Sequence, residues 1–249
     1  MKQTAYGNPM SINGDTLEIL TKTVALDEAN IQELIFRHPE CLPISDIDES
    51  FNPAIPVCTE LNTPVGPLDI LMTTPTGEII IIETKLWRNP EARRIVVAQI
   101  LDYAKELAKW TYEDLQREIN RRLMSSGNIL YKIVSITESP FLLEEKDFID
   151  TISRNLFRGK FLLLIVGDGI REGAAGIAEF LETAGHLSFS FGMIELLVYK
   201  KKNDELIIMP RTLAKTVELQ KITVEIPLGL SLSRSSDKAE TINTQSYSQ

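Results

Sequence analysis

The feature that most constrains the fold of this chain is a run of four isoleucines, Ile79–Ile82, within the segment EIIIIETKLW. Successive side chains of a strand point to opposite faces, so four consecutive isoleucines make both faces apolar. Strands of this kind are usually buried in a sheet that helices cover on both sides. The run therefore predicts a central strand over Glu78–Leu86 with helices above and below it.

A second apolar run, Leu68–Thr74, precedes this strand, and only Pro75-Thr76-Gly77 separates the two. A three-residue connection that contains glycine, between two such runs, is typical of a β-hairpin. If the runs pair directly across this turn, Asp69 lies opposite Glu83. Residues that are directly opposed in an antiparallel pair share a face, so the hairpin brings two carboxylates together.

Lys85 points to the same face as Glu83, two residues earlier, whereas Thr84 points away. Two facing acids repel each other unless a cation neutralises them or one takes up a proton. Two carboxylates with a backbone carbonyl, here that of Thr84, suit Mg²⁺, for which Mn²⁺ can substitute. An amine beside such an ion can activate water and offset charge on a phosphate, so the group predicts phosphodiester hydrolysis. The alternative is a set of exposed side chains at a fraying strand end.

Two helices offer supporting residues. Asn89-Pro90-Glu91 is typical of a helix start, and the helix is expected to extend to about Trp110. Gln99 and Tyr103 share one of its faces, where the amide could bind a metal-bound water or a phosphate and the tyrosine could support it; alternatively, Gln99 lies at the edge of the core. Glu33, in a helix expected over Asp27–Arg37, is a candidate metal ligand or else a surface acid.

Strands and helices alternate along the rest of the chain, which predicts an α/β domain with a central mixed sheet flanked by helices. The other expected strands are Val57–Leu61, Ile129–Thr137, Phe161–Val166, Phe189–Lys200 and Leu206–Pro210, and the other expected helices are Glu113–Met124, Glu145–Leu156 and Glu172–Ala184. We divide the chain into an N-terminal lead (1–26), a core (27–137), a C-terminal α/β extension on the same sheet (138–227) and a disordered tail (228–249), which is rich in Ser, Thr and Gln.

Composition limits the chemistry. The chain has two cysteines and two histidines, none at metal-site spacing, which argues against a structural zinc site and a disulfide framework. Any metal should therefore be a hard ion held by carboxylates. We find no signal peptide and no stretch of eighteen uninterrupted apolar residues, so we expect a soluble, cytoplasmic protein with no membrane partner.

Charge is unevenly distributed along the 249 residues. The formal net charge of −9 argues against tight nonspecific binding to nucleic acid. Residues 1–91 hold 5 basic and 14 acidic side chains, whereas residues 92–160 hold 12 basic and 10 acidic ones. The basic segment begins with Arg93 and Arg94, which are candidate nucleic-acid contacts or members of a solvated helix face. Trp87 could stack on a base or pack beneath the next helix.

Together these motifs resemble the PD-(D/E)XK nuclease superfamily, which has the restriction-endonuclease-like fold. The sequence has Gly66-Pro67-Leu68-Asp69, then Glu83-Thr84-Lys85, then Gln99-Ile100-Leu101-Asp102-Tyr103, preceded by Glu33 in a helix. This order is similar to the branch that contains RecB-type exonucleases and Holliday-junction resolvases. The resemblance covers residues 27–110. It implies an α-β-β-β-α-β core, a metal site at Asp69, Glu83 and Glu33, Lys85 as the water-activating residue, and Gln99 with Tyr103 as supporting residues.

The sequence thus predicts a Mg²⁺-dependent deoxyribonuclease, in restriction, repair or phage defence. The alternative is a noncatalytic nucleic-acid-binding or assembly module that keeps the same fold. DNA is the expected partner, and a homodimer or a partner protein of a defence or repair system is compatible with the sequence. The form of the nucleic acid and the mode of cleavage stay open.

Overall fold

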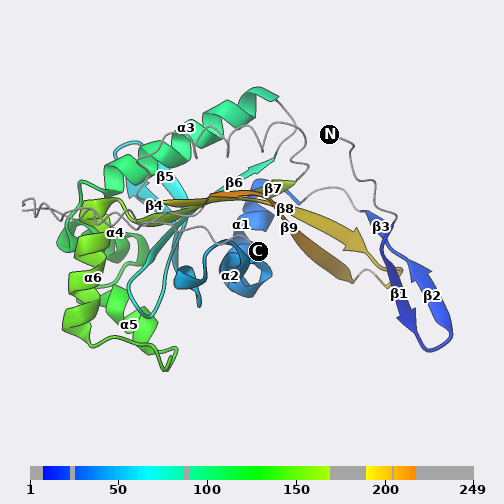
Figure 1. Ribbon diagram of the computed structural model, residues 1–249, viewed down its shortest axis with the longest axis horizontal. Coiled ribbons are helices and arrows are strands. Elements are labelled where there is room, and N and C mark those ends of the chain that lie inside the picture. Colours follow the sequence, from blue (N-terminus) through cyan, green and yellow to red (C-terminus); the bar gives the residue numbers. More distant parts are fainter. Residues whose placement is uncertain (1–7, 23–25, 87–89, 169–188, 204, 217–249) are drawn as a thin grey trace, which may run out of the picture. The chain divides into compact units, whose positions relative to one another are not determined.

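The computed structural model describes residues 8–22, 26–86, 90–168, 189–203 and 205–216, and for residues 90–94 it describes the backbone alone. Its main element is a seven-stranded sheet in the order β3-β8-β7-β6-β5-β4, with β9 paired to β8 (Figure 1). The strands are β3 (Thr21–Lys22), β4 (Ile55–Thr63), β5 (Gly66–Thr73), β6 (Ile79–Leu86), β7 (Phe161–Asp168), β8 (Ser190–Lys200) and β9 (Leu206–Thr216). The β6–β7 and β7–β8 pairs are parallel and the others antiparallel, so the predicted mixed sheet is confirmed.

Helices cover both faces of this sheet (Figure 1). One face packs against α1 (Glu28–Arg37), α2 (Ile44–Ile47) and the short 3₁₀ turns Pro39–Cys41 and Glu49–Phe51. The other packs against α3 (Pro90–Leu107), α4 (Tyr112–Leu123), α5 (Ile129–Ser135) and α6 (Glu145–Arg158). The predicted α/β class with a central sheet flanked by helices is confirmed.

The isoleucine run divides between the two cores, as its alternation requires. Ile79 and Ile81 pack with α3 to α6, and Ile80 and Ile82 pack with α1 and α2. All four side chains are at most 1% exposed. The strand therefore has no solvent face along this stretch, and a polar group on it can lie only near an end.

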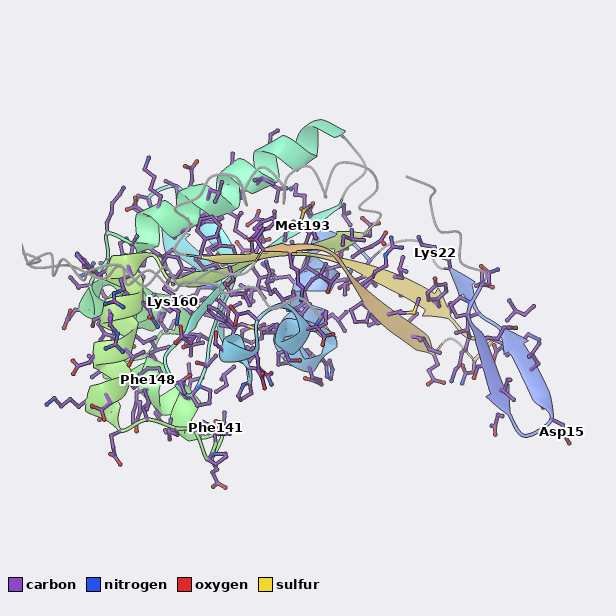
Figure 2. The ribbon with its side chains drawn as sticks, in the orientation of Figure 1. Asp15, Lys22, Phe141, Phe148, Lys160 and Met193 are labelled. Atoms are coloured by element: carbon purple, nitrogen blue, oxygen red, sulfur yellow. The ribbon has the colours of Figure 1, made fainter. Side chains whose placement is uncertain are left out.

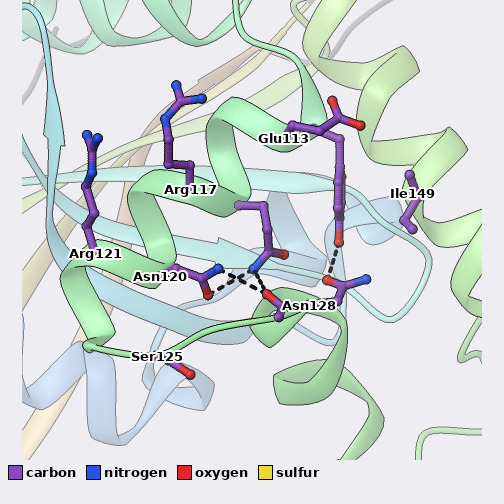
Figure 3. A pocket seen from close by; sticks show the side chains of 10 residues that line it. Glu113, Arg117, Asn120, Arg121, Ser125, Asn128 and Ile149 are labelled. Atoms are coloured by element: carbon purple, nitrogen blue, oxygen red, sulfur yellow. Dashed lines mark hydrogen bonds between the residues drawn. The ribbon is translucent and has the colours of Figure 1, made fainter.

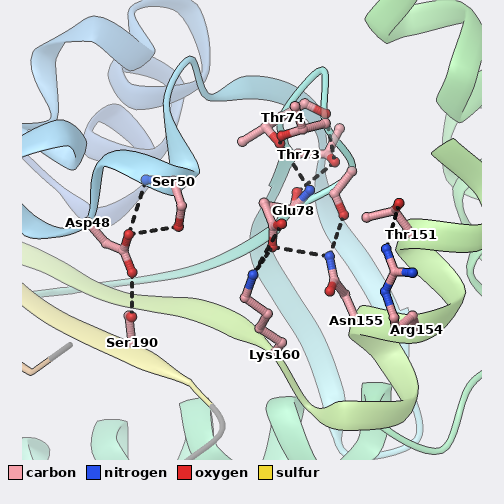
Figure 4. A network of polar contacts seen from close by, with 12 residues as sticks. Asp48, Ser50, Thr73, Thr74, Glu78, Thr151, Arg154, Asn155, Lys160 and Ser190 are labelled. Atoms are coloured by element: carbon pink, nitrogen blue, oxygen red, sulfur yellow. Dashed lines mark hydrogen bonds and ion pairs between the residues drawn. The ribbon is translucent and has the colours of Figure 1, made fainter. Parts of the chain in front are cut away.

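The β5–β6 hairpin has the predicted register, with Ile70 opposite Ile82 and Thr73 opposite Ile79. Its turn, at the other end of the hairpin from Asp69 and Glu83, is held by a polar network that includes Asn155 of α6 and Lys160 (Figure 4). The Glu78 carboxylate accepts a hydrogen bond of 3.1 Å from Asn155, and Lys160 lies 3.2 Å from it. Burial is the main cause of a raised pKa at Glu78, and Lys160 opposes it. The register that aligns the predicted site is thus fixed at the opposite end of the hairpin.

One predicted element is wrong, because residues 129–135 form helix α5 and not a strand. The Asn128 side chain caps this helix by accepting a hydrogen bond from the Tyr131 amide at 3.2 Å. Leu130 and Val134, four residues apart, are the buried positions. This spacing is helical, and it outweighs the strand preference of the β-branched residues in the segment.

The other predictions differ mostly in extent. The strands predicted at Val57–Leu61 and Leu206–Pro210 are the longer β4 and β9. The segment that we expected to be a lead holds β1 (Met10–Asn13) and β2 (Thr16–Ile19), which form a separate two-stranded sheet, and β3. The helix expected at residues 172–184 and the tail at 228–249 lie outside the described residues.

We expect Ile81→Ala to destabilise the fold by about 2–5 kcal/mol, because it removes buried methyl groups from the central strand and leaves a cavity. The free energy of unfolding in urea measures this effect. Ile136→Ala is the matched control, since Ile136 is 71% exposed, and it should change stability by less than about 0.5 kcal/mol. Equal effects of the two substitutions would contradict the central position of β6.

Candidate active site

Three acids lie in a row across β4, β5 and β6. In β4, Thr59 pairs with Ile70 and Leu61 with Leu68, so Glu60 lies opposite Asp69. The β5–β6 register places Glu83 on the other side of Asp69, one position beyond the last recorded pair. Asp69 is therefore the middle acid of three neighbouring strands, and this row is the centre of the candidate site.

The Asp69 side chain bonds to β6 just beyond the last backbone pair of β5 and β6. Its Oδ2 accepts hydrogen bonds of 2.7 Å from both the amide and the hydroxyl of Thr84. Oδ1 accepts no hydrogen bond from the part of the chain that the structure describes. Burial raises the pKa of Asp69, although the bonds from Thr84 favour its charged form. One oxygen is thus fixed, and the other is available to a ligand.

Glu83 is the most perturbed acid of the row. It is 3% exposed, and its buried Oε2 has no hydrogen-bond partner among the described residues. Burial, followed by the nearby charge of Asp69, raises its pKa to about 9, while Lys85 opposes the shift. A buried carboxylate oxygen without a donor is costly, which marks this position as one built for a proton or a cation.

Helix α1 contributes two residues that the sequence did not indicate. Glu28 lies 3.2 Å from the Lys85 amine, and it also accepts a 3.0 Å hydrogen bond from the Leu86 amide. Gln32, one turn later, donates to Glu60 at 2.7 Å and to the Asp69 backbone carbonyl at 3.0 Å. The two side chains share a helix face and tie α1 to all three strands of the site.

Glu33, the predicted metal ligand in α1, lies away from the row of acids. Its carboxylate pairs with Arg37 at 2.6 Å and its side chain is 58% exposed, so the structure does not bring this predicted ligand into the row of acids. The buried positions of α1 are Ile31 and Ile35. Glu33 follows Ile31 by two residues and therefore points away from the sheet, whereas Glu28 and Gln32 border the buried stripe. That helical phase is the signal that could have identified Glu28.

Glu60 has an unusual backbone, with φ = 52° in the left-handed region. A non-glycine residue rarely adopts this conformation, which costs on the order of 1 kcal/mol or more. The conformation falls where the β4–β5 pairing omits Glu60 between two regular pairs. Such strain is common at functional sites, and it adds Glu60 to the candidate residues.

Gln99 and Tyr103 lie together at the start of β5, as their helical spacing predicted. Gln99 donates to the Tyr103 hydroxyl at 2.9 Å, and this hydroxyl donates to the Pro67 carbonyl at 2.5 Å. Gly66 has a φ of 127°, which disfavours other residues, although a Cβ there would make only an ordinary contact of 3.6 Å with the same hydroxyl. Burial raises the pKa of Tyr103, and the charges of Glu83, Asp69 and Glu60 act in the same direction.

The predicted nucleic-acid contacts receive no side-chain description. Trp87 lies outside the described residues, and Arg93 and Arg94 are described only as backbone of α3. In α4, Arg117 pairs with Asp114 at 2.6 Å and Arg121 pairs with Glu118 at 2.7 Å. These arginines belong to a solvated helix face with local partners.

The donor set fits a hard cation. Asp69 Oδ1 and Glu83 Oε2 are carboxylate oxygens that accept no hydrogen bond from the described residues, and they lie on neighbouring strands. Among the residues that the structure describes, no group of three or more His, Cys, Asp or Glu side chains is arranged to hold a metal. A metal here would need backbone carbonyl, water or substrate oxygens to complete its shell.

A cavity of about 590 Å³ lies elsewhere, lined by α4, by the segment between α4 and α5, and by Ile149 of α6 (Figure 3). Its polar groups largely bind one another: Gln116 donates to Asn120 at 3.1 Å and to the Gly127 carbonyl at 2.7 Å, and Tyr112 donates to Asn128 at 2.6 Å. It shares no lining residue with the row of acids. We therefore assign the cavity no part in the candidate chemistry.

Comparisons of this chain with protein-family models, with curated proteins and with solved structures found no match. The resemblance described above therefore stays a prediction from the residues. Within the described part of the chain, no helix has the length and apolar character needed to cross a membrane.

We expect Glu83→Gln to remove part of the pH dependence of stability. Between pH 4.5 and about 9 the folded protein holds a proton on Glu83 that the unfolded chain has lost, so the free energy of unfolding falls as pH rises. Glutamine mimics the protonated acid. Without divalent metal, the variant should match the wild type at pH 5 and exceed its unfolding free energy by on the order of 2 kcal/mol at pH 8. Urea unfolding across this range tests the shift, and a constant difference between the two proteins would refute it.

Proposed function

We propose that this protein is a Mg²⁺-dependent nuclease that hydrolyses phosphodiester bonds in DNA, with a restriction-endonuclease-like core. The observation that carries the proposal is the buried Glu83, which lies beside Asp69 at the end of the central strand and has an oxygen without a hydrogen-bond donor among the residues that the structure describes. A protein gains no stability from this arrangement, because two nearby buried acids disfavour each other's charge. Retention of the pair is expected where it binds a cation that the reaction needs.

The order of elements supports the proposal. Helix α1, strands β4, β5 and β6, helix α3 and strand β7 occur along the chain in the α-β-β-β-α-β order that the resemblance implies, with α2 inserted between α1 and β4 and with α4, α5 and α6 inserted between α3 and β7. The three motifs of that resemblance meet at one end of the sheet. Asp69 comes from β5, Glu83 and Lys85 come from β6, and Gln99 with Tyr103 comes from α3.

In this proposal each residue of the site has a separate role. Asp69 and Glu83, with the Thr84 backbone carbonyl, would hold Mg²⁺ or Mn²⁺, which lowers the pKa of bound water and stabilises charge on the phosphate. The Lys85 side chain is 32% exposed, so it can reach a bound phosphate or orient water while its stem stays in the site. Glu28, 3.2 Å from this amine, holds it near the acids when no substrate is present.

A specific observation also favours the noncatalytic alternative. Lys85 already has a carboxylate partner in Glu28, and Asp69 already accepts two hydrogen bonds from Thr84. A domain that only binds nucleic acid or a partner protein could use these contacts as structural ties. The two functions differ in whether a bond is broken.

The first test is cleavage by the purified chain with Mg²⁺ or Mn²⁺ across single-stranded, double-stranded and branched DNA and RNA. We expect Lys85→Ala to lower the cleavage rate by about 10²–10⁴-fold, because it removes the amine beside the reacting phosphate. Lys109→Ala is the matched control, since Lys109 is an exposed lysine paired with Glu106 on α3's side of the fold. Thermal melting should show that both variants stay folded.

Two outcomes of this test count against the proposal. Cleavage of no substrate, together with no binding of either metal in calorimetry, refutes the nuclease. Binding of metal and nucleic acid without cleavage favours the noncatalytic module. Asp69→Ala separates the cases further, because in a nuclease it should remove both the calorimetric signal and the cleavage.

A second prediction compares two glutamates of the same helix. Glu28→Gln should change the rate of cleavage by about tenfold or more, because it removes the charge that positions Lys85. Glu33→Gln should leave the rate within about twofold, since Glu33 contacts only Arg37 on the described surface. Rates at several pH values provide the measurement, and a larger effect of Glu33→Gln would show that the phase of α1 is misassigned.

A further inference from the structure

A second row of polar positions crosses the sheet two residues beyond Glu83 in β6. Lys85 of β6 pairs with Gly167 of β7, and Gly167 pairs with Glu195 of β8. Glu195 in turn pairs with Arg211 of β9. Positions that are paired across a sheet share a face, and Gly167 contributes no side chain to it. The row therefore leads from Lys85 to Arg211 on the face of the sheet to which Glu83 belongs.

Glu195 is a buried acid whose partner lies on the next strand. It is 3% exposed, and its carboxylate accepts a 2.5 Å hydrogen bond from Arg211 Nη2. Met193, which Figure 2 labels on β8, lies two residues earlier and packs in the core on α3's side of the sheet. A buried carboxylate is costly unless it is paired, so Glu195 keeps the Arg211 guanidinium beside it.

Arg211 has donors that this pairing leaves unused. Its Nε is buried and donates to no acceptor in the part of the chain that the structure describes. The side chain as a whole is 42% exposed, so part of it is accessible to a ligand. A guanidinium presents five N–H donors in one plane, and it binds the oxygens of a phosphate or carboxylate two at a time. Because a buried donor without an acceptor is costly, Arg211 is suited to an oxygen anion.

The distance between the two cations of the row limits which anion can use both. Neighbouring strands lie about 4.8 Å apart, so the three steps from Lys85 to Arg211 span about 14 Å. A single small anion cannot contact both side chains at this separation. Each strand of duplex DNA has one phosphate roughly every 3.4 Å along its axis, so a polynucleotide can contact both at once.

We propose that Arg211, held by Glu195, binds a backbone phosphate of the nucleic-acid substrate a few nucleotides from the bond that is cleaved. The inference rests on the proposed function, because it takes the row of acids as the point of cleavage. Contacts to phosphates fix the position of the nucleic acid and read no sequence. Arg211 lies too far from Lys85 to touch the reacting phosphate, so it should strengthen binding without changing the rate of the chemical step.

The test is the fluorescence anisotropy of a labelled DNA duplex of about 20 base pairs, which is longer than the row. The full chain carries Lys85→Ala, which keeps the DNA intact, and Mg²⁺ is present. The variant combines Glu195→Gln with Arg211→Gln, so the buried pair stays hydrogen-bonded and the net charge is unchanged. We expect the dissociation constant to rise by about tenfold. The slope of log affinity against log salt should become shallower by about 0.9, as the loss of one phosphate contact requires.

The matched control combines Glu33→Gln with Arg37→Gln. This pair is also a glutamate and an arginine, at 2.6 Å, but both side chains are more than half exposed on α1. The control should change the dissociation constant by less than about twofold, because exposed pairs of this kind contribute little to stability and lie outside the row. Thermal melting should show that both double variants stay folded.

The outcomes separate this contact from the nuclease activity. Unchanged affinity in the Glu195 and Arg211 variant overturns the contact, even if the wild type cleaves DNA. Weaker binding with an unchanged salt slope also overturns it, because the effect is then structural. Weaker binding with a shallower slope supports the contact, even if the wild type cleaves nothing and the nuclease is refuted. A chain that binds no DNA overturns both.

A second variant keeps the proposal testable if the double variant fails to fold. Arg211→Lys retains the positive charge beside Glu195 but has no Nε donor and no planar pair of donors. We expect it to weaken binding of the same duplex by about threefold or more. Binding equal to that of the chain with Arg211 overturns the contact.

Discussion

Burial of β6 on both faces is the constraint on which the rest of the structure depends. Its isoleucines are shared between two cores, so the strand can move neither toward one helix layer nor the other without opening a cavity. Its neighbours, β5 and β7, are held in register by the same packing. Polar chemistry is thereby confined to the strand's end, where Glu83 and Lys85 follow the last isoleucine.

The row of acids at that end opposes the stability of the fold. At three helix ends local sequence and structure agree: Asp27 caps α1, a capping box at Thr111 and Asp114 begins α4, and Gly159 ends α6 in the left-handed conformation. At the row, the backbone of Glu60 is strained and the charge of Glu83 is disfavoured. A local conflict of this kind, in which strain and a disfavoured charge meet, is what a functional site produces.

Much of this arrangement could be predicted because it rests on short-range periodicity. The hairpin register follows from two apolar runs and a three-residue turn, and it places Asp69 beside Glu83 without knowledge of the rest of the fold. The shared face of Gln99 and Tyr103 follows from helical spacing in the same way. Such features depend on residues within a few positions of one another.

The features that escaped prediction depend on tertiary packing. The choice between Glu28 and Glu33 is set by which side of α1 meets the sheet, and that is decided by Ile31 and Ile35 against distant strands. Glu60 gains its place from a backbone conformation that composition does not reveal. Residues 129–135 carry a strand-like composition that their burial pattern overrides. To predict these features, one must know which distant part of the chain each helix or strand packs against, as well as its own sequence.

The hydrogen bond from the Tyr103 hydroxyl to the Pro67 carbonyl affects the position of Gln99 relative to Asp69. The two residues are 36 positions apart in sequence, yet one hydrogen bond joins them. Two hydrogen bonds, from Gln99 to Tyr103 and from Tyr103 to Pro67, connect the Gln99 side chain to the start of β5, two residues before Asp69. This connection is much shorter than the one along the chain through β6. The spacing between the Gln99 amide and the Asp69 carboxylate is therefore set by contacts within α3 and the first residues of β5.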